Sequence, residues 1–129
     1  MDMINSLSTI IICIKMDNCL FCKIINGEIT AKKVYENEHI IAFNDIDPKA
    51  PIHILVIPKK HIRSINELNS SDINLAGEII LAAKKIAKDQ GVDSKGFRVV
   101  FNTNDDGGQT VYHIHMHIMG GRQMQWPPG

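Results

Sequence analysis

Three of the six histidines of this 129-residue chain stand at alternate positions near its carboxyl end. They are His113, His115 and His117, and the residues between them are the apolar Ile114 and Met116. Because successive side chains of a β-strand point to opposite faces, this spacing places all three imidazoles on one face and the apolar residues on the other. A single histidine in a strand is most often structural, but three on one face predict a chemical site.

Two kinds of chemistry suit this row. Alternate residues of a strand lie roughly 6.6 Å apart, so the three imidazoles cannot share one ion. The pair His113 and His115 can bind zinc with a third ligand from elsewhere, and the metal then activates water in a hydrolase or hydratase. Alternatively, the central His115 attacks phosphorus directly, because an imidazole with a pKa of about 6.5 is largely neutral at pH 7. The metal alternative lacks both a His-Glu-x-x-His motif and an acidic third ligand beside the strand.

The segment immediately before the row offers hydrogen-bond donors to an anion. It contains Gly107, Gly108, Gln109 and Thr110. Glycines allow backbone N–H groups to turn toward a phosphate, and the threonine hydroxyl is a further donor. The simpler interpretation of this segment is a hairpin turn. Beside three histidines, we favour a phosphate-binding loop.

Several segments must position these residues. Runs of β-branched and aromatic residues predict strands over 33–36, 40–44, 52–57, 97–103 and 111–119, with a loop at 45–51 and a turn at 104–109. Apolar residues at helical spacing predict a short helix over 19–25 and a long helix that begins at Asp72 as its N-cap and ends before Gly91. His53 is the only polar residue of its strand. Short strands with one long helix predict an α+β domain on an antiparallel sheet.

Composition narrows the class of protein. The length fits one domain, and the 44% hydrophobic and 22% charged residues are typical of a globular chain. Fourteen basic residues balance fourteen acidic ones, so we expect neither nucleic acid nor a membrane surface as a partner.

The amino-terminal segment carries no recognisable export signal. Its apolar run at 10–14 is too short to span a bilayer and follows Asp2 rather than a basic residue. The odd number of three cysteines fits a reducing compartment, the cytosol or the nucleus. We expect residues 1–15 to form a mobile extension and residues 16–129 to form the domain.

The run His113-Ile114-His115-Met116-His117-Ile118-Met119 matches the His-φ-His-φ-His-φ-φ pattern of the histidine-triad (HIT) superfamily. The chain resembles the Hint branch of that superfamily from Leu20 to Gly129. Further matching blocks lie at 43–46, 51–61, 106–113 and 120–129. The resemblance implies the histidine-triad fold, in which an antiparallel sheet of about five strands with one long and one short helix continues across a homodimer.

The same resemblance implies a purine nucleoside phosphoramidase. Such an enzyme hydrolyses compounds of the adenosine 5′-monophosphoramidate type to a nucleoside monophosphate, AMP or GMP, and an amine. The nucleophile falls on His115, which forms a nucleotidyl-histidine intermediate that water then hydrolyses. The flanking catalytic residues fall on His117 and His53, close to the phosphate, and on His113, which supports the site by donating to a backbone carbonyl.

The nucleotide-binding residues that the resemblance implies share one pocket with the row. In it, Asp45 accepts the ribose hydroxyls and apolar walls hold the base, and Trp126 matches a tail that reaches toward the partner subunit's site. The alternative for Leu20, Phe21 and Phe43 is plain core packing. The implied set is Leu20, Phe21, Ile24, Phe43, Asp45, Ile46, His53, Asn102, Gly108, Gln109, Thr110, Val111, His115 and His117.

The pair Cys19-x-x-Cys22 is shared with many microbial relatives of the Hint branch. In these, two cysteines join residues matching His61 and His113 around a structural zinc, and the resemblance implies no cofactor for catalysis. The alternative is that both cysteines are small buried packing residues and that His61 caps a strand end. A further alternative for the whole chain is a nucleotide-binding or interaction module with little turnover.

Overall fold

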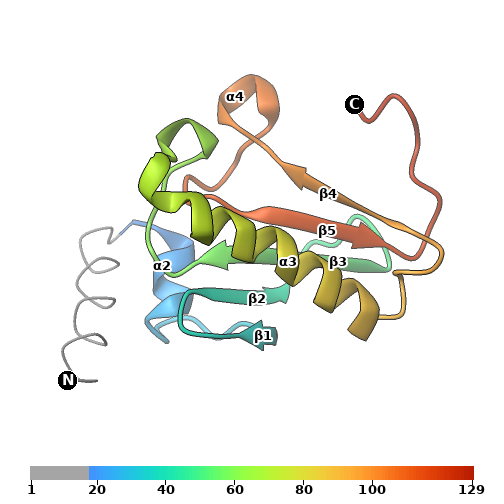
Figure 1. Cartoon of the computed structure of the whole chain (residues 1–129), viewed down its shortest axis with the longest axis horizontal. Coiled ribbons are helices and arrows are strands. Elements are labelled where there is room, and N and C mark those ends of the chain that lie inside the picture. Colours follow the sequence, from blue (N-terminus) through green and yellow to red (C-terminus); the bar gives the residue numbers. More distant parts are fainter. Residues whose placement is uncertain (1–17) are drawn as a thin grey trace.

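The computed structural model describes residues 18–129, so the predicted extension over 1–15 lies outside the described residues. The described part is built on one antiparallel five-stranded sheet with the order β1-β2-β3-β5-β4 (Figure 1). The strands are β1 (Lys33–Glu36), β2 (Ile40–Asn44), β3 (Ile52–Pro58), β4 (Phe97–Phe101) and β5 (Met116–Gly120). The predicted α+β fold on an antiparallel sheet is confirmed.

The sequence of β3 is apolar because this strand lies in the middle of the sheet. It pairs with β2 on one side and with β5 on the other, and its residues from His53 onward are buried. In the register with β5, His53 lies opposite Met119 and Leu55 lies opposite His117. His53 and His117 are therefore diagonal neighbours on the same face of the sheet, a spacing that side chains of this size can bridge.

The long helix α3 (Ile73–Asp89) covers one face of the sheet (Figure 1). Its buried side chains pack with residues of β2, β3 and β5 into one hydrophobic core. The members of this core include Ile79, Ala83 and Ile86 of the helix and Ile40, Ile54, Met116 and Ile118 of the sheet. No helix in the described part of the chain is long and apolar enough to cross a membrane.

The opposite face is covered differently, because its helix α2 (Leu20–Ile25) has only six residues. A second, smaller core forms beneath it from Phe21, Ile24, Ile41, Phe43, Leu55 and Ile57. Leu55 belongs to this core and stands opposite His117, so the histidines lie on the α2 face. A helix this short covers only part of the sheet, and the histidines occupy the adjoining part.

The segments that flank the row differ from the sequence prediction. The strand predicted over 111–119 begins only at Met116, because the Ile114 N–H donates to the carbonyl of Ile62 at 2.6 Å rather than to a sheet neighbour. His113 and His115 therefore precede the strand instead of lying within it. The strand predicted over 97–103 ends at Phe101.

One predicted turn and one predicted helix cap also differ in detail from the structure. The predicted turn at 104–109 contains a short helix, α4 (Asn104–Gly107), which ends at the left-handed Gly108 with φ 81°. Asp72 occupies the N-cap position of α3, as predicted, but its side chain makes no capping hydrogen bond to the helix. Its carboxylate instead accepts the Asn69 N–H at 3.1 Å and pairs with Lys60 at 2.7 Å. Two 3-10 turns, Ile65–Glu67 and Ser70–Asp72, lead into the helix.

Candidate active site and metal centre

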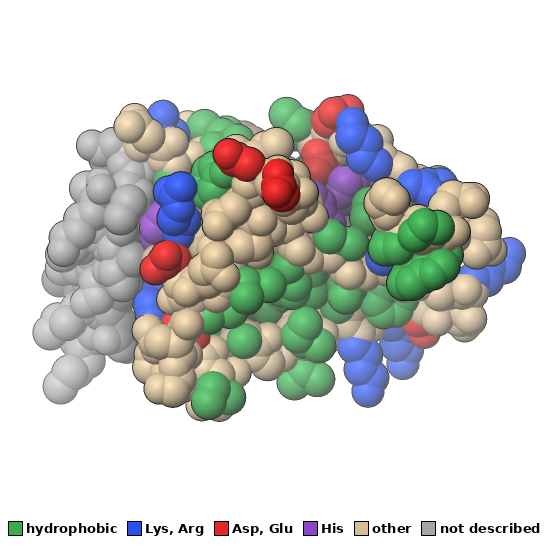
Figure 2. All heavy atoms as spheres, turned by 90° about the horizontal axis from the view of Figure 1, so that it is seen from above, with side chains coloured by type: hydrophobic (Ala, Val, Ile, Leu, Met, Phe, Trp, Pro, Cys, Tyr) green, Lys and Arg blue, Asp and Glu red, His purple; other side chains and the backbone are tan. Residues whose placement is uncertain are grey.

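Five of the six histidines lie along the α2 face in two groups, one of His61 and His113 and one of His115, His117 and His53. Ring centroids are 4.9 Å apart for His61 and His113, 5.0 Å for His115 and His117, and 5.2 Å for His117 and His53. Phe21 of α2 joins the two groups, with its ring edge-on to His113 at 5.9 Å and to His115 at 5.1 Å. In the space-filling view, histidine side chains are visible between acidic, basic and hydrophobic side chains (Figure 2).

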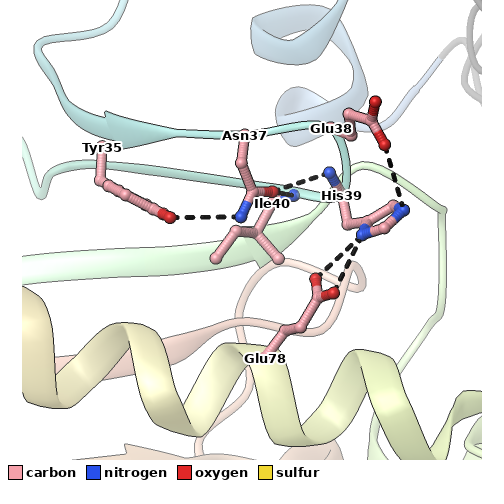
Figure 3. A network of polar contacts seen from close by, with 6 residues as sticks. All are labelled: Tyr35, Asn37, Glu38, His39, Ile40 and Glu78. Atoms are coloured by element: carbon pink, nitrogen blue, oxygen red, sulfur yellow. Dashed lines mark hydrogen bonds and ion pairs between the residues drawn. The ribbon is translucent and has the colours of Figure 1, made fainter.

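The sixth histidine, His39, lies apart from the row in the turn between β1 and β2 (Figure 3). Its Nδ1 contacts the carboxylate of Glu78 on α3 at 3.0 Å. The Asn37 side chain accepts the N–H groups of His39 and Ile40, which closes the turn. His39 therefore ties the hairpin to the long helix and takes no part in the row.

The tautomer of His115 follows from its backbone partner. Its Nδ1 lies 2.8 Å from the carbonyl oxygen of His113, and a carbonyl only accepts, so we assign the proton to Nδ1. Nε2 then carries a lone pair. Burial lowers the pKa of His115, although the hydrogen bond to His113 opposes this shift. The ring is neutral at pH 7 and presents an unprotonated Nε2, which is what a nucleophile requires.

The tautomer of His117 is set through His53. The Lys49 N–H lies 2.9 Å from His53 Nδ1, and because a backbone N–H only donates, this nitrogen must accept. Neutral His53 therefore carries its proton on Nε2, which lies 2.9 Å from His117 Nδ1 and donates to it. This leaves the proton of His117 on Nε2. Burial lowers the pKa of His53 and brings that of His117 to about 4.

His117 Nε2 is the one buried side-chain nitrogen or oxygen of the described residues that has no hydrogen-bond partner. Leaving a buried donor unpaired costs about 1–3 kcal/mol, so such an atom indicates a position where a ligand supplies the acceptor. The donor belongs to the ring next to His115. A lone pair on His115 and an N–H on His117 therefore stand side by side, which suits attack on phosphorus with a phosphoryl oxygen held.

Two cysteines and two histidines meet at the other end of the row. Cys19 Sγ lies 3.3 Å from His113 Nδ1, Cys22 Sγ lies 3.5 Å from His61 Nδ1, and the two nitrogens are 3.1 Å apart. In tetrahedral zinc with bonds of about 2.0–2.3 Å, neighbouring ligand atoms are about 3.3–3.8 Å apart. The four groups therefore have the chemistry and the approximate spacing of a structural zinc site.

The outer contact of His113 supports this assignment. Its Nε2 lies 2.8 Å from the carbonyl oxygen of Pro58 and so carries the proton, as predicted, while Nδ1 turns its lone pair toward the cysteines. A metal-binding histidine commonly donates its other N–H to such a carbonyl. The alternative in which His113 and His115 share a catalytic zinc is not supported, because these two rings do not belong to one ligand cluster among the described residues.

A second group of potential ligands, Asp45, His53 and His117, fits a metal less well. A metal on His53 Nε2 would require the proton on Nδ1, where the Lys49 N–H already donates. The Asp45 carboxylate lies 3.5 Å from His53 Nε2 and favours a proton on that nitrogen. These three residues therefore suit a hydrogen-bonded group rather than an ion.

Only some of the residues predicted for the nucleoside pocket are accessible to a ligand. Phe21, Ile24 and Phe43 are buried in the smaller core, as the packing alternative expects of Phe21 and Phe43. Leu20 is 43% exposed and Ile46 is 99% exposed, so these two side chains remain available to a base. Asn102 follows β4, and Val111 packs against the smaller core.

The predicted phosphate-binding loop uses most of its donors internally. The N–H groups of Gly108 and Gln109 donate to the carbonyls of Asp105 and Asn104 at 3.0 Å. The Gln109 amide donates to the carbonyls of Arg63 and Val111. In this structure neither Gly108 nor Gln109 offers its N–H to an anion, whereas Thr110 is exposed.

Two contributors to the site were not identified from the sequence. The backbone N–H of Lys49 sets the tautomer of His53, and the guanidinium of Arg122 holds the carbonyl of Lys49. A backbone group has no sequence signature. The only signal in the sequence is the pair of prolines, Pro48 and Pro51, that restricts the conformation of this loop.

Known proteins with similar sequences and structures carry histidine-triad names. The family model described as "Scavenger mRNA decapping enzyme C-term binding" matches residues 18–126. An uncharacterized HIT-like protein of Synechococcus elongatus is 47% identical over 113 residues, which are 88% of this chain and 98% of that protein. The crystal structure of a HIT family hydrolase from Legionella pneumophila has a TM-score of 0.85 and 57% identity, covering 86% of this chain and 99% of that one. The structure of a histidine triad nucleotide-binding protein from Candida albicans has a TM-score of 0.73 and 31% identity, covering 84% and 82%.

The lowered pKa of His117 predicts a dependence of stability on pH. Between pH 6.5 and about 4 the unfolded chain binds a proton at this residue that the folded chain does not, so folding is favoured above this window and loses stability as the pH falls through it. The variant His117→Gln lacks this group, and its melting temperature should fall less steeply from pH 6.5 to 4 than that of the wild type. Parallel curves for the two proteins would contradict the burial of a neutral imidazole here.

Proposed function

Because the chain belongs to the histidine-triad (HIT) superfamily, we propose that it is a hydrolase that cleaves the P–N bond of purine nucleoside phosphoramidates, such as adenosine 5′-monophosphoramidate. The observation that carries this proposal is the lone pair on His115 Nε2 beside the unpaired N–H on His117 Nε2. The names of the relatives support it, since one is a HIT family hydrolase and another a nucleotide-binding protein.

In the first step, the lone pair of His115 Nε2 forms a bond to phosphorus. The P–N bond of the substrate breaks, and its nitrogen leaves as the amine with a proton taken from water. The His117 Nε2–H donates to a phosphoryl oxygen and stabilises the charge that gathers there. The carbonyl of His113 stabilises the ring of His115 while it carries a positive charge, because Nδ1–H remains hydrogen-bonded to it.

In the second step, water attacks the same phosphorus. The bond between phosphorus and His115 Nε2 breaks, its electron pair returns to the ring, and the nucleoside monophosphate leaves. One proton of the water is released to solvent. The sum of both steps is the hydrolysis of a phosphoramidate to a nucleoside monophosphate and an amine, and the histidine is regenerated.

The nucleoside is assigned to the surface between α2 and the end of β2. Asp45 directly follows β2, and its side chain is about four-fifths buried beside His53, where a carboxylate can accept two ribose hydroxyls. The exposed Leu20 and Ile46 are placed to contact a purine base. We propose Asp45 as the residue that recognises the ribose.

We also propose that Cys19, Cys22, His61 and His113 hold one structural zinc. All four protein ligands are supplied by the chain, so no coordination position is left for a substrate or an activated water. Zinc at this site would fix α2 to the segment that precedes His115. His113 belongs to both groups, since its ring faces the cysteines and its carbonyl accepts from His115.

A homodimer is the assembly that we propose. In the described part of the chain β4 is an edge strand of the sheet, and it exposes Phe97 and Val99. Helix α3 exposes Ile73, Ile80 and Leu81. Figure 2 looks onto the β4 edge and shows hydrophobic side chains gathered in the middle of this face. Exposed apolar area of this kind is typical of protein interfaces.

The covalent step predicts a specific effect of His115→Ala. Turnover of adenosine 5′-monophosphoramidate should fall at least about a thousandfold, since the nucleophile is lost, while AMP affinity stays within about threefold because the pocket remains. Wild-type protein quenched during turnover should gain the mass of one nucleotidyl group, and the variant should not. AMP binding without turnover by the wild type would instead indicate a binding module.

The zinc proposal predicts one zinc per chain in protein that is purified without a histidine tag. Cys22→Ser should lose both the metal and thermal stability, because the unfolded chain has no preformed site and zinc binding therefore favours folding. His39→Gln is the control, since this histidine lies apart from the cluster, and it should keep the metal. Substoichiometric zinc in stable wild-type protein would leave the cysteines as packing residues.

The dimer proposal predicts a mass in solution near twice the 14.4 kDa of one chain when light scattering is measured at micromolar concentration. Placing a charge on the exposed edge, as in Val99→Glu, should shift the protein toward the monomer, because the charge would be buried without a partner. A wild-type protein that is monomeric throughout this range would overturn the proposal.

A further inference from the structure

The carboxyl-terminal tail returns to the loop that follows β2. Arg122 donates from Nε and Nη2 to the carbonyl oxygen of Lys49, at 3.1 and 2.9 Å. The residue before it, Gly121, has φ of 90°, and a Cβ at this position would lie 2.9 Å from Cβ of Pro51. The tail is therefore in close contact with the loop at a position where only glycine fits.

Lys49 is held on both sides of its α-carbon. Its carbonyl accepts the two bonds from Arg122, and its N–H donates to His53 Nδ1 at 2.9 Å. The Lys49 side chain points to Asp47, with Nζ at 2.7 Å from the carboxylate. The hydrogen bond from Lys49 to His53 is therefore made by the backbone and not by the side chain, and Arg122 restricts the rotation that would move the N–H away from the ring.

The direction of this N–H decides what His117 offers to a ligand. With the N–H in place, protons stand on Nε2 of His53 and on Nε2 of His117. Without it, only the Asp45 carboxylate, 3.5 Å from His53 Nε2, still favours this form, and His53 can also carry its proton on Nδ1 and accept at Nε2 from His117 Nδ1–H. His117 Nε2 would then present a lone pair, which repels phosphoryl oxygens instead of binding them. A single change of tautomer thus converts a donor into an acceptor.

We propose that Arg122 is a positioning residue for the phosphoryl-transfer step and that it acts through the backbone of Lys49 to hold His53 and His117 in their Nε2–H tautomers. This inference rests on the proposed function for its kinetic consequence, but the tautomers themselves are independent of substrate. Arg122 donates to the carbonyls of Lys49 and Gln123, so its effect on the two imidazoles is transmitted through the loop.

An arginine suits this position better than other donors. Two N–H groups of one planar guanidinium reach the same carbonyl, and a third reaches the carbonyl of Gln123 at 3.1 Å. A lysine can supply charge and one bond but not the fixed fork. A second arginine in contact with the same tail, Arg98 of β4, donates to the carbonyl of Gln125 at 2.9 Å and does not touch the loop. Arg98 is therefore the matched control.

The test compares the wild type with Arg122→Gln, Arg122→Lys and Arg98→Gln. Ring ¹⁵N NMR at pH 7.5, without substrate, reports which nitrogen of each histidine carries the proton. We expect one tautomer at His53 and His117 in the wild type and in Arg98→Gln, and a mixture in Arg122→Gln. Arg122→Lys should show a smaller fraction of the second tautomer than Arg122→Gln. It also keeps the test decisive if Arg122→Gln does not fold.

Kinetics with adenosine 5′-monophosphoramidate give the second measurement. Arg122→Gln should lower kcat about tenfold or more and change KM less than about threefold, because the lost donor acts mainly in the transition state. Unchanged tautomers in Arg122→Gln, or the same mixture in Arg98→Gln, would overturn the proposal. If the wild type does not hydrolyse the phosphoramidate, the proposed function fails, and the NMR comparison still decides the role of Arg122.

Discussion

Backbone groups that only donate or only accept fix the proton positions of the histidine row, and the chemistry of the site depends on this constraint. The carbonyls of Pro58 and His113 accept hydrogen bonds from the rings of His113 and His115, respectively. The N–H of Lys49 donates to Nδ1 of His53. The protonation state of the second nitrogen of each ring is thereby fixed. A lone pair faces the cysteines, a second is available to attack, and an N–H remains to hold an anion. An imidazole in solution exchanges between these forms, so it is the fold that separates the roles of otherwise identical side chains.

The two cores of the domain explain why the row can be partly buried and still reachable. The α3 face is closed by a helix of seventeen residues, and it supplies the larger core. The α2 face is closed by a helix of six residues, whose Cys19 cap and Cys22 also meet His61 and His113. The metal cluster and the nucleophile therefore depend on the same short helix, through the packing of Phe21 against His113 and His115. A displacement of α2 would disturb both.

The pattern of side chains along the sequence predicted the strands, the main helices and the shared face of the three histidines. Alternation placed His113, His115 and His117 on one face, and five strands and both main helices lie close to where the sequence predicts them. The lead-in to β5 was assigned to the strand because alternation continues through it, although its hydrogen bonds go to Ile62 instead. The glycine-rich segment fits a phosphate loop by composition, yet its N–H groups close a helical turn. Such choices depend on which backbone partner is nearer in space, and the sequence does not contain that distance. Lys49 and Arg122 were missed for the same reason.

The neutrality of the row determines how it can bind an anion. Five imidazoles with centroids about 5 Å from their neighbours would repel one another if they were charged. Burial lowers the pKa of each of them, to about 4 for His113 and His117, so the row is uncharged at neutral pH. Attraction of a phosphoryl group therefore cannot come from histidine charge, and the chain as a whole has a formal net charge of zero. Directed N–H donors can supply this attraction, and they work only when their protons stand on the correct nitrogen. A site of this kind gains affinity from orientation rather than from charge, and for that reason the loop that orients His53 is as important to it as the imidazoles themselves.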